Sequence, residues 1–383
     1  MSELDAWKIV PAAKRIVVKI GSSTLARDGQ LRPRIFSGLA RDVSRVIESG
    51  REVVVVSSGA IAVGAHRLGW THAGESIREM QAAAAVGQIG LVELYQRRFA
   101  KWGLQVGQVL LTRSGLEDRE RFLNARRTML ELLRLGVVPI VNENDTIATE
   151  EIRFGDNDNL AATIVNAIDA DLLVILTDVE GLYERAPVPG KRRPALIRTV
   201  QKITPEIRRA ASGAGTRFGS GGMITKLEAA TNAARSGAAT VLCNGRITGV
   251  LEKLINGERH GTLFEPGERL RSKKHWLAFT ARTHGRIVID EGAARALIES
   301  GRSLLPAGIL RVEGDFQIGD SVCCVDDQGR EIARGLAGYS AKDIQHLAGR
   351  STKEISRVLG YTNGDEIIHR DDLVLVRDHT GSN

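Results

Sequence analysis

Two glycine-containing segments, far apart in the chain, each combine small residues with a single lysine. Residues 17–23 read Val-Val-Lys-Ile-Gly-Ser-Ser, and residues 220–226 read Ser-Gly-Gly-Met-Ile-Thr-Lys. Small residues let backbone N–H groups approach a phosphate closely, and a lysine supplies the positive charge that phosphate oxygens need. Neither segment matches the P-loop pattern G-x-x-x-x-G-K-[ST]. The two segments therefore predict the two halves of a polyphosphate site of a different construction.

Lys19 interrupts an apolar run, residues 16–20, that should form a strand buried on both faces. A lysine in such a place costs several kcal/mol unless an anion meets its charge. The alternative is a lysine that reaches solvent or pairs with a structural carboxylate. Because Lys19 stands at the end of the strand, beside a Gly-Ser turn, we favour a ligand phosphate as the anion.

Polar turns follow four of the apolar runs, at residues 19–23, 57–60, 142–145 and 177–178. In a parallel α/β sheet, ligands bind beyond the carboxyl ends of the strands. Each turn alone is equally compatible with a simple strand-to-helix connection, which also favours Gly, Ser, Thr and Asn. Four such turns together favour a binding site.

Asn and Asp are concentrated in residues 142–159. The sequence 155–159, Gly-Asp-Asn-Asp-Asn, resembles the start of a calcium loop. An EF-hand is excluded, since Leu160 stands at the fifth ligand position and Ala161 at the required glycine. Carboxylates that meet an ammonium, and amides that meet a carboxylate, would instead bind a small zwitterion. A solvated loop with Asx turns would be preferred if this segment stood alone.

The elements that position these residues follow from hydrophobic periodicity. Six runs rich in Val, Ile and Leu predict buried strands. They are 15–20, 52–56, 106–111, 137–141, 172–176 and 240–243. Helical patterns lie between them. Residues 35–47 share an apolar face, and Gly50 is expected to end that helix. Ser114 and Glu117 form a capping-box pattern ahead of apolar residues at helical spacing over 122–132. This alternation predicts an α/β fold, a three-layer αβα sandwich around a mostly parallel sheet.

Beyond this region, Gly, Pro and charged residues cluster in 262–274, which predicts a linker. Short strands are expected after it at 286–290, 309–312, 321–325 and 331–335, with helices at 291–300 and 341–348 and Ser340 and Asp343 as a capping box. The predicted domains are 1–265, a linker at 266–275, and a small, mostly β domain with a C-terminal tail at 276–383.

Composition sets limits on the class of protein. The 383 residues favour two domains, and 43% hydrophobic with 26% charged residues is typical of a soluble globular protein. Aromatic residues, at 4%, disfavour a stacking surface, and a net charge of +7 suits anionic ligands without predicting nucleic acid. The three cysteines lack metal-ligand spacing, which predicts no protein-built metal site. Residues 1–15 contain no apolar signal segment, and no apolar run is long enough to span a bilayer. We therefore expect a cytoplasmic protein with no membrane partner.

Five motifs occur together in one order and spacing, and with residues 118–126 they resemble the glutamate 5-kinase branch of the amino-acid kinase family. They are 18–23, 58–61, 142–145, 155–159 and 220–226. Residues 290–293, 303–306 and 308–309 resemble the PUA domain appended to those enzymes, so the resemblance covers nearly the whole chain. Departures are an N-terminal extension and Ile224, where serine or threonine is usual, so that one nucleotide contact would be weakened.

The resemblance implies that ATP phosphorylates the γ-carboxylate of L-glutamate, the first step of proline biosynthesis. It implies that Lys19 and Lys226 flank the transferred phosphoryl group and that Asp158 orients both lysines. Glutamate would contact Ser58, Asp145 and Asn157. Glycines at 21, 59 and 221 would let backbone amides approach. The ATP-binding residues would be Lys19, Gly21, Thr177, Asp178, Ser220, Gly221, Gly222, Met223, Ile224, Thr225 and Lys226. Mg²⁺ would be bound chiefly by phosphates and water, proline would inhibit, and the chain would form a homo-oligomer.

Two other readings stay open. One is a kinase of the same fold that acts on acetylglutamate, aspartate or a nucleotide; the 142–159 pattern and the appended domain argue against it. The other is an RNA-binding protein, since PUA domains elsewhere bind RNA, which predicts a basic face with aromatic residues. Residues 286–361 mix both charges and hold only Phe316, Tyr339 and Tyr361 as aromatics. A structural or regulatory role for this domain is therefore favoured.

Overall fold

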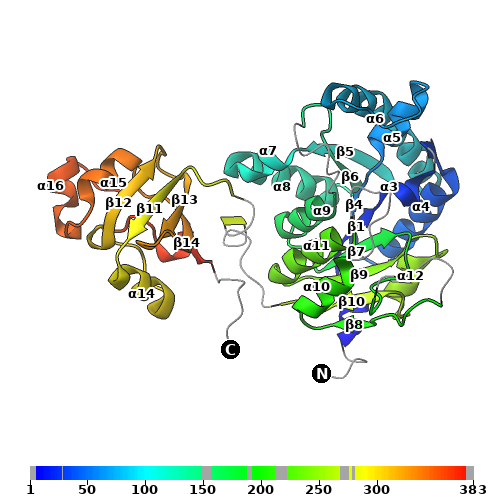
Figure 1. The fold of residues 1–383 in the computed structure, drawn as a ribbon. Helices are drawn as coiled ribbons and strands as arrows, with labels where there is room; N and C mark the ends of the chain where they lie inside the picture. Colours follow the sequence, from blue (N-terminus) through cyan, green and yellow to red (C-terminus); the bar gives the residue numbers. More distant parts are fainter. Residues whose placement is uncertain are drawn as a thin grey trace. The chain divides into compact units, whose positions relative to one another are not determined.

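The structure, a computed structural model, describes residues 6–27, 29–148, 157–185, 187, 192–212, 222–267, 276–277 and 281–376. The chain divides into two compact units, the first with residues Met1–Leu116 and Glu120–Leu270 and the second with Arg271–Asn383 together with Glu117–Arg119 (Figure 1). None of the helices in these described ranges is both long enough and apolar enough to cross a membrane.

The first unit is built on an eight-stranded sheet with the order β5-β6-β4-β1-β7-β9-β10-β8. In that order the strands are Gln105–Leu111, Val137–Glu143, Glu52–Val56, Arg15–Ile20, Leu172–Thr177, Ala239–Asn244, Thr262–Phe264 and Thr199–Val200. The six long strands are all parallel, and β10 runs antiparallel to β9. All six predicted strands are confirmed, and their ends differ by at most two residues from the expectation.

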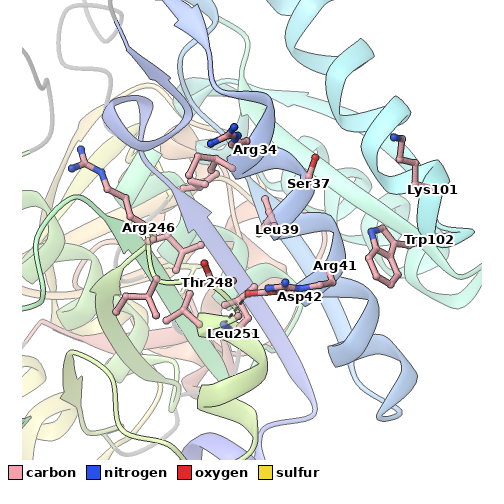
Figure 2. A pocket seen from close by; sticks show the side chains of 18 residues that line it. Arg34, Ser37, Leu39, Arg41, Asp42, Lys101, Trp102, Arg246, Thr248 and Leu251 are labelled. Atoms are coloured by element: carbon pink, nitrogen blue, oxygen red, sulfur yellow. Dashed lines mark hydrogen bonds and ion pairs between the residues drawn. The ribbon is translucent and has the colours of Figure 1, made fainter.

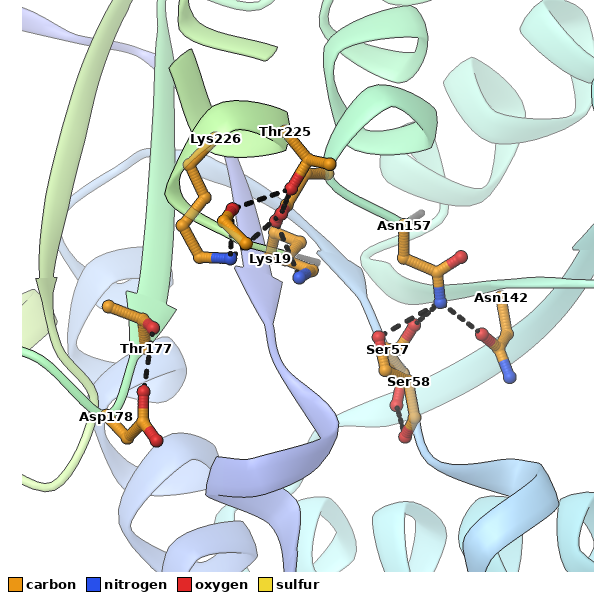
Figure 3. A network of polar contacts seen from close by, with 11 residues as sticks. Lys19, Ser57, Ser58, Asn142, Asn157, Thr177, Asp178, Thr225 and Lys226 are labelled. Carbon is orange, nitrogen blue, oxygen red and sulfur yellow. Dashed lines mark hydrogen bonds and ion pairs between the residues drawn. The ribbon is translucent and has the colours of Figure 1, made fainter. Parts of the chain in front are cut away.

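Helices cover both faces of this sheet, as predicted. Side chains alternate between the faces along a strand, and Val18 and Ile20 of β1 belong to a core cluster with α4 (Pro33–Glu48) and α12 (Val250–Ile255). Lys19, between them, points to the opposite face, toward α9 (Asn157–Ala167) and α11 (Met223–Arg235), as Figure 3 shows. The other elements of this unit are α2 (Ile9–Ala12), α3 (Ser22–Leu25), β2 (Ala26–Arg27), β3 (Gln30–Leu31), α5 (Ala60–Arg67), α6 (Ile77–Phe99), α7 (Arg113–Glu117), α8 (Arg119–Arg134) and α10 (Pro205–Ser212).

The two helix predictions had different outcomes. Helix α4 ends at Glu48, and Gly50 follows with a φ of 82°, a conformation that glycine adopts without strain. The expected capping role of Ser114 is wrong, because Ser114 lies inside α7, and the apolar residues over 122–132 belong to the separate helix α8. The hydroxyl of Thr112, just ahead of α7, accepts the hydrogen bond from the Gly115 amide at 3.0 Å.

Helices α5 and α6 pack backbone against backbone. A Cβ on Gly87 would lie 1.9 Å from the carbonyl oxygen of Ala60, and one on Gly64 would lie 1.6 Å from that of Ala83. Only glycine permits so close an approach. The contact holds α6 against the start of α5, directly after the turn that leaves β4, and this brings the polar face of α6 near the end of β6.

The second unit contains a five-stranded sheet with the order β12-β11-β13-β14-β15 over one hydrophobic core. Its strands are Ile309–Gly314, Gly285–Ile289, Ser321–Val325, Glu331–Leu336 and Leu373–Leu375, and its helices are α14 (Glu291–Ser300), α15 (Ala341–Leu347) and α16 (Ile355–Leu359). The hydroxyl of Ser340 caps α15 by accepting the Asp343 amide hydrogen bond, as predicted. The sequence missed β15 and α16, both short.

The segment 262–274, in which the linker was expected, begins too early, whereas the predicted domain bounds with a linker at 266–275 stay a prediction. Residues Thr262–Phe264 form β10, which pairs with β9 and β8 inside the first unit's sheet, and Thr262 and Leu263 are fully buried. The Gly and Pro residues that suggested a linker follow this strand. Residues 268–275, where the rest of the predicted linker falls, lie outside the described ranges.

Candidate active site

Three buried charged side chains meet above the carboxyl ends of the central strands. Lys19 Nζ lies 2.6 Å from Oδ1 of Asp158, and Lys226 Nζ lies 3.0 Å from Oδ2 of the same carboxylate (Figure 3). Asp158 is 1% exposed, Lys19 5% and Lys226 8%. They come from the first turn of α9, the end of β1 and the first turn of α11, three segments that only the tertiary fold brings together.

The carboxyl group of Asp158 is held ionised by this arrangement. Burial alone would raise its pKa, but the charges of Lys19 and Lys226 and their hydrogen bonds outweigh burial and lower the pKa to about 2. The Thr225 hydroxyl also donates to Oδ2, at 2.9 Å. Two cations share one anion, so the cluster keeps a surplus positive charge in a nearly water-free place, where it attracts an anionic ligand strongly.

Gly21, in the turn after β1, and Gly222, ahead of α11, lie beside this cluster. The amide of Gly21 donates to the carbonyl of Leu176 at 3.2 Å, which joins the turn after β1 to the end of β7. Gly222 precedes α11, and among the described residues other than its chain neighbours no atom lies within 4 Å of the place where its Cβ would stand. Met223 and Ile224 follow in the first turn of this 13-residue helix, whose amino end favours an anion. Ser220 and Gly221 lie outside the described residues.

Thr177 and Asp178 lie at the end of β7, the strand next to β1. The Thr177 hydroxyl donates to the Asp178 carboxylate at 3.3 Å, and the Thr177 carbonyl accepts the Gly245 amide at 2.8 Å. Thr177 is buried and Asp178 half-buried. The structure thus gathers Lys19, Thr177 and Lys226 at the carboxyl edge of neighbouring strands, as the sequence predicted for ligand-binding residues.

A second polar group surrounds Asn157. Its amide nitrogen donates to the Ser57 carbonyl at 2.6 Å, to the Ser58 hydroxyl at 3.0 Å and to Oδ1 of Asn142 at 2.9 Å (Figure 3). These contacts fix the direction of the amide. Oδ1 of Asn157 is buried and accepts no hydrogen bond within the described structure. A buried acceptor without a partner is costly, so this atom calls for a donor from a ligand.

Two further residues support this group, and sequence reasoning missed both. Gln88 accepts a hydrogen bond from Asn142 Nδ2 at 2.8 Å, and the hydroxyl of fully buried Tyr95 donates to the Ser57 hydroxyl oxygen at 3.0 Å. Both belong to the interior of helix α6, where no motif marks them. The sequence suggested that Asn142 lies in the turn after the strand, but Asn142 lies within β6.

Asp145 lies in the turn beyond β6 and is half-buried. Burial raises the pKa of its carboxyl group to about 6. Across the described ranges, no side chain or backbone group forms a hydrogen bond or ion pair with this carboxylate. A half-buried carboxylate without a partner is suited to a cationic group of a ligand. Residues 149–156, which include Gly155 and Asp156 of the predicted loop, lie outside the described ranges.

No group of three or more His, Cys, Asp or Glu side chains in the described ranges could hold a metal ion. Asp158, the most buried carboxylate of the site, is already engaged by two lysines. A divalent ion at this site would therefore need ligands from a bound phosphate chain and water, which is the usual way that Mg²⁺ binds at phosphoryl-transfer sites.

Comparison with known proteins agrees with the fold and with this site. Residues 14–244 match the model of the amino acid kinase family, and residues 285–359 match that of the PUA domain. Among curated proteins, the glutamate 5-kinase of Cupriavidus taiwanensis is 50% identical over 372 residues, covering 96% of this chain and 99% of that protein. The glutamate 5-kinase of Methylobacillus flagellatus is 50% identical over 368 residues, 95% of this chain and 98% of that protein. These findings confirm the resemblance seen in the sequence motifs: the chain belongs to the amino acid kinase family, in its glutamate 5-kinase branch, and carries a PUA domain.

Proposed function

We propose that this chain transfers the γ-phosphoryl group of ATP to the γ-carboxylate of L-glutamate, giving γ-glutamyl phosphate and ADP. The observation that carries the proposal is the buried cluster of Lys19, Asp158 and Lys226, two cations on one carboxylate. Its surplus charge suits a phosphoryl group in transfer. The product is the activated acid from which proline biosynthesis starts.

The chemistry needs little beyond position and charge. A γ-carboxylate with a pKa of about 4.3 is already ionised at pH 7, so the reaction needs no general base. The barrier is the approach of one anion to another, and fixed positive charges at the transferred group lower it. Lys19 and Lys226 supply these charges from two sides. Asp158 separates the two ammonium groups and holds each at a fixed position.

Three side chains provide a matching site for the amino-acid end of glutamate. The carboxylate of Asp145 and Oδ1 of Asn157 have no partner among the described residues, and both are acceptors suited to the α-ammonium group. The Ser58 hydroxyl oxygen accepts from Asn157 Nδ2, so its proton is available for the α-carboxylate. Ser58 follows β4 and Asp145 follows β6, whereas Asn157 opens α9 directly ahead of Asp158. A glutamate held by these three side chains would therefore have room to direct its γ-carboxylate toward the lysine cluster.

The ATP phosphates would lie between the Gly21 turn and the amino end of α11, with Thr177 and Asp178 beside them. Among the described residues, the space at the Cβ position of Gly222 is open, which fits close approach of phosphate oxygens. When bound, Mg²⁺ would neutralise charge on these phosphates, held chiefly by phosphates and water. We further propose inhibition by proline at the glutamate site, assembly into a homo-oligomer, a cytoplasmic location and a structural or regulatory role for the PUA domain.

A trapping assay tests the assignment directly. Purified protein is supplied with ATP, Mg²⁺ and one amino acid at a time, and hydroxylamine converts any acyl phosphate to a hydroxamate. L-Glutamate should give hydroxamate together with ADP, whereas L-aspartate and N-acetyl-L-glutamate should give little. If hydroxamate forms mainly from one of the other two acids, that acid is the acceptor instead of glutamate. If no acid gives hydroxamate, the proposed function is rejected.

A further inference from the structure

A pocket of about 520 Å³ opens on the first unit, on the face of the sheet opposite Asp158 (Figure 2). Ile20 and Leu176 form its floor. Each is adjacent in its strand to a residue of the candidate active site, Lys19 or Thr177, and points to the opposite face of the sheet. Helix α4, the short 3-10 helix Ala100–Trp102 and the loop over 245–249 form its walls. Its volume falls within the range of small-molecule sites, roughly 300–1,000 Å³.

Positive charge dominates the walls of this pocket. The cationic side chains are Arg34, Arg41, Lys101 and Arg246. Asp42 is the one carboxylate among the described lining residues, and it accepts hydrogen bonds from Arg41 at 2.8 Å and from the Leu251 amide at 3.3 Å. Within the described ranges, the side chains of the other three cations form no ion pair and no hydrogen bond. The pocket therefore presents unmatched positive charge to any ligand that enters.

The remaining lining is apolar. Ile20, Leu39 and Leu176 are buried at the base, and Trp102 stands at the rim with 38% of its surface exposed. Figure 2 shows Trp102 and Lys101 on one side of the opening and Arg246 on the other, with Arg34 near the top. An apolar base under a cationic rim suits a ligand with an apolar or ring-shaped body and one anionic group. Planar guanidinium groups match phosphate oxygens with paired hydrogen bonds.

We propose that this pocket is a second ligand site, which binds a small phosphorylated molecule with an apolar or ring-shaped body. The site is distinct from the cluster around Asp158, because the two lie on opposite faces of the sheet. Along β1, for example, Lys19 points to the cluster and Ile20 points to the pocket. It is nevertheless close along the chain: Ile20 separates Lys19 from Gly21, and the carbonyl of Leu176 accepts the Gly21 amide. A test must therefore separate the two sites.

Phenyl phosphate is the probe, titrated calorimetrically into the full-length protein that is already saturated with Mg²⁺ and a non-hydrolysable ATP analogue. We expect saturable binding with a stoichiometry of one per chain. The double variant Arg34→Gln/Arg246→Gln should bind the probe at least tenfold more weakly. The matched control Arg295→Gln/Arg357→Gln removes the same charge from exposed positions of the second unit and should bind as the parent does. Phenol and inorganic phosphate, each half of the probe, should both bind more weakly than the whole.

Three results would overturn the proposal. One is the absence of saturable binding to the parent protein. Another is unchanged affinity in the Arg34→Gln/Arg246→Gln variant, whose fold is checked by circular dichroism; both arginines are exposed, so the fold should persist. The third is loss of binding in Lys226→Ala with full binding in the arginine variant, which would place the probe at the phosphoryl-transfer site instead.

Discussion

Lys19 and Lys226 contact opposite oxygens of one buried carboxylate, the first from strand β1 and the second from helix α11. Two ammonium groups this close would repel each other strongly in a place with so little water. Asp158 removes most of that repulsion and still leaves one unit of positive charge in excess. The site is therefore stable without a ligand and remains attractive to an anion.

Removing either lysine should cripple turnover. In Lys19→Ala and in Lys226→Ala we expect kcat to fall by on the order of 10²-fold or more, because each change removes charge directed at the transition state. Lys342→Ala, on an exposed position of α15, is the matched control and should be unaffected. Steady-state kinetics with the hydroxamate assay provide the measurement. Near-normal turnover in both site variants, with unchanged circular dichroism, would reject the assignment.

Asp158→Asn should change how stability depends on pH. The pKa of Asp158 is about 2 in the folded protein, below its ordinary 3.8. A lowered pKa means that the ionised carboxylate stabilises the fold above the unfolded-state pKa, and that this stabilisation is lost as pH falls from about 4 toward 2. Its size is about 2 kcal/mol by linkage. The free energy of unfolding of the variant, measured against the parent from pH 7 downward, should show a deficit that shrinks in that window. A deficit of constant size would contradict the low pKa.

Much of the fold was predictable because its signals are local. Apolar runs marked the six long strands. The lysine inside one of them was expected to meet a ligand phosphate rather than a structural carboxylate, but its partner in the structure is the carboxylate of Asp158; the phosphate contact stays a prediction. The site around Asn157 was predictable only in part. Asn142 and Gln88 are 54 residues apart and Gln88 belongs to a helix interior, so no spacing or turn pattern points to their contact. Such pairs depend on how α6 packs, which Gly64 and Gly87 decide.

The errors have the same origin. Ser114 and Glu117 satisfy the capping-box spacing, yet the hydroxyl of Thr112 accepts the hydrogen bond from the Gly115 amide. Helix α7 therefore begins at Arg113, before Ser114. Thr262–Phe264 is a short strand next to Gly and Pro residues, and only its pairing with β9 shows that it belongs to the first unit. Local patterns thus identify elements correctly and fail where a tertiary neighbour decides between two local choices.

The glutamate contacts should affect the Michaelis constant rather than turnover. In Asp145→Asn and Asn157→Ala we expect KM for glutamate to rise about tenfold or more with a smaller change in kcat, since we propose that both side chains contact the non-reacting end of the substrate. KM for ATP should change little. The proposal fails if ATP affinity falls while glutamate affinity is kept.

Asp145 should also impose a pH dependence on glutamate binding. Burial raises its pKa to about 6, so below that pH the carboxyl group is protonated and loses its attraction for an ammonium group. We expect kcat/KM for glutamate to decline as pH falls through about 6. Asp145→Asn should lack this decline and retain a low, flat value over the same range. An identical pH profile in parent and variant would show that another group titrates.

Gln88 should act as a positioning residue. It holds Asn142, which in turn accepts a hydrogen bond from Asn157, so Gln88→Leu would free the Asn142 amide to rotate and weaken one of the contacts that orient Asn157. We expect KM for glutamate to rise several-fold with kcat unchanged. Gln96→Leu, at an exposed position of the same helix, is the control for a change that only affects α6. Equal effects of the two substitutions on KM would indicate a general loss of helix packing.

The catalytic unit should work without the second unit. Every described residue that we place at the phosphate or glutamate site lies before residue 267, and the first unit has its own sheet and core. A fragment of residues 1–267 should therefore keep measurable glutamate kinase activity, and a fragment of residues 276–383 should have none. Hydroxamate formation by truncated and full-length protein at equal concentration makes the comparison, with circular dichroism as the check on folding. A well-folded first fragment without activity would mean that the PUA domain completes the active site, directly or through assembly of the chain.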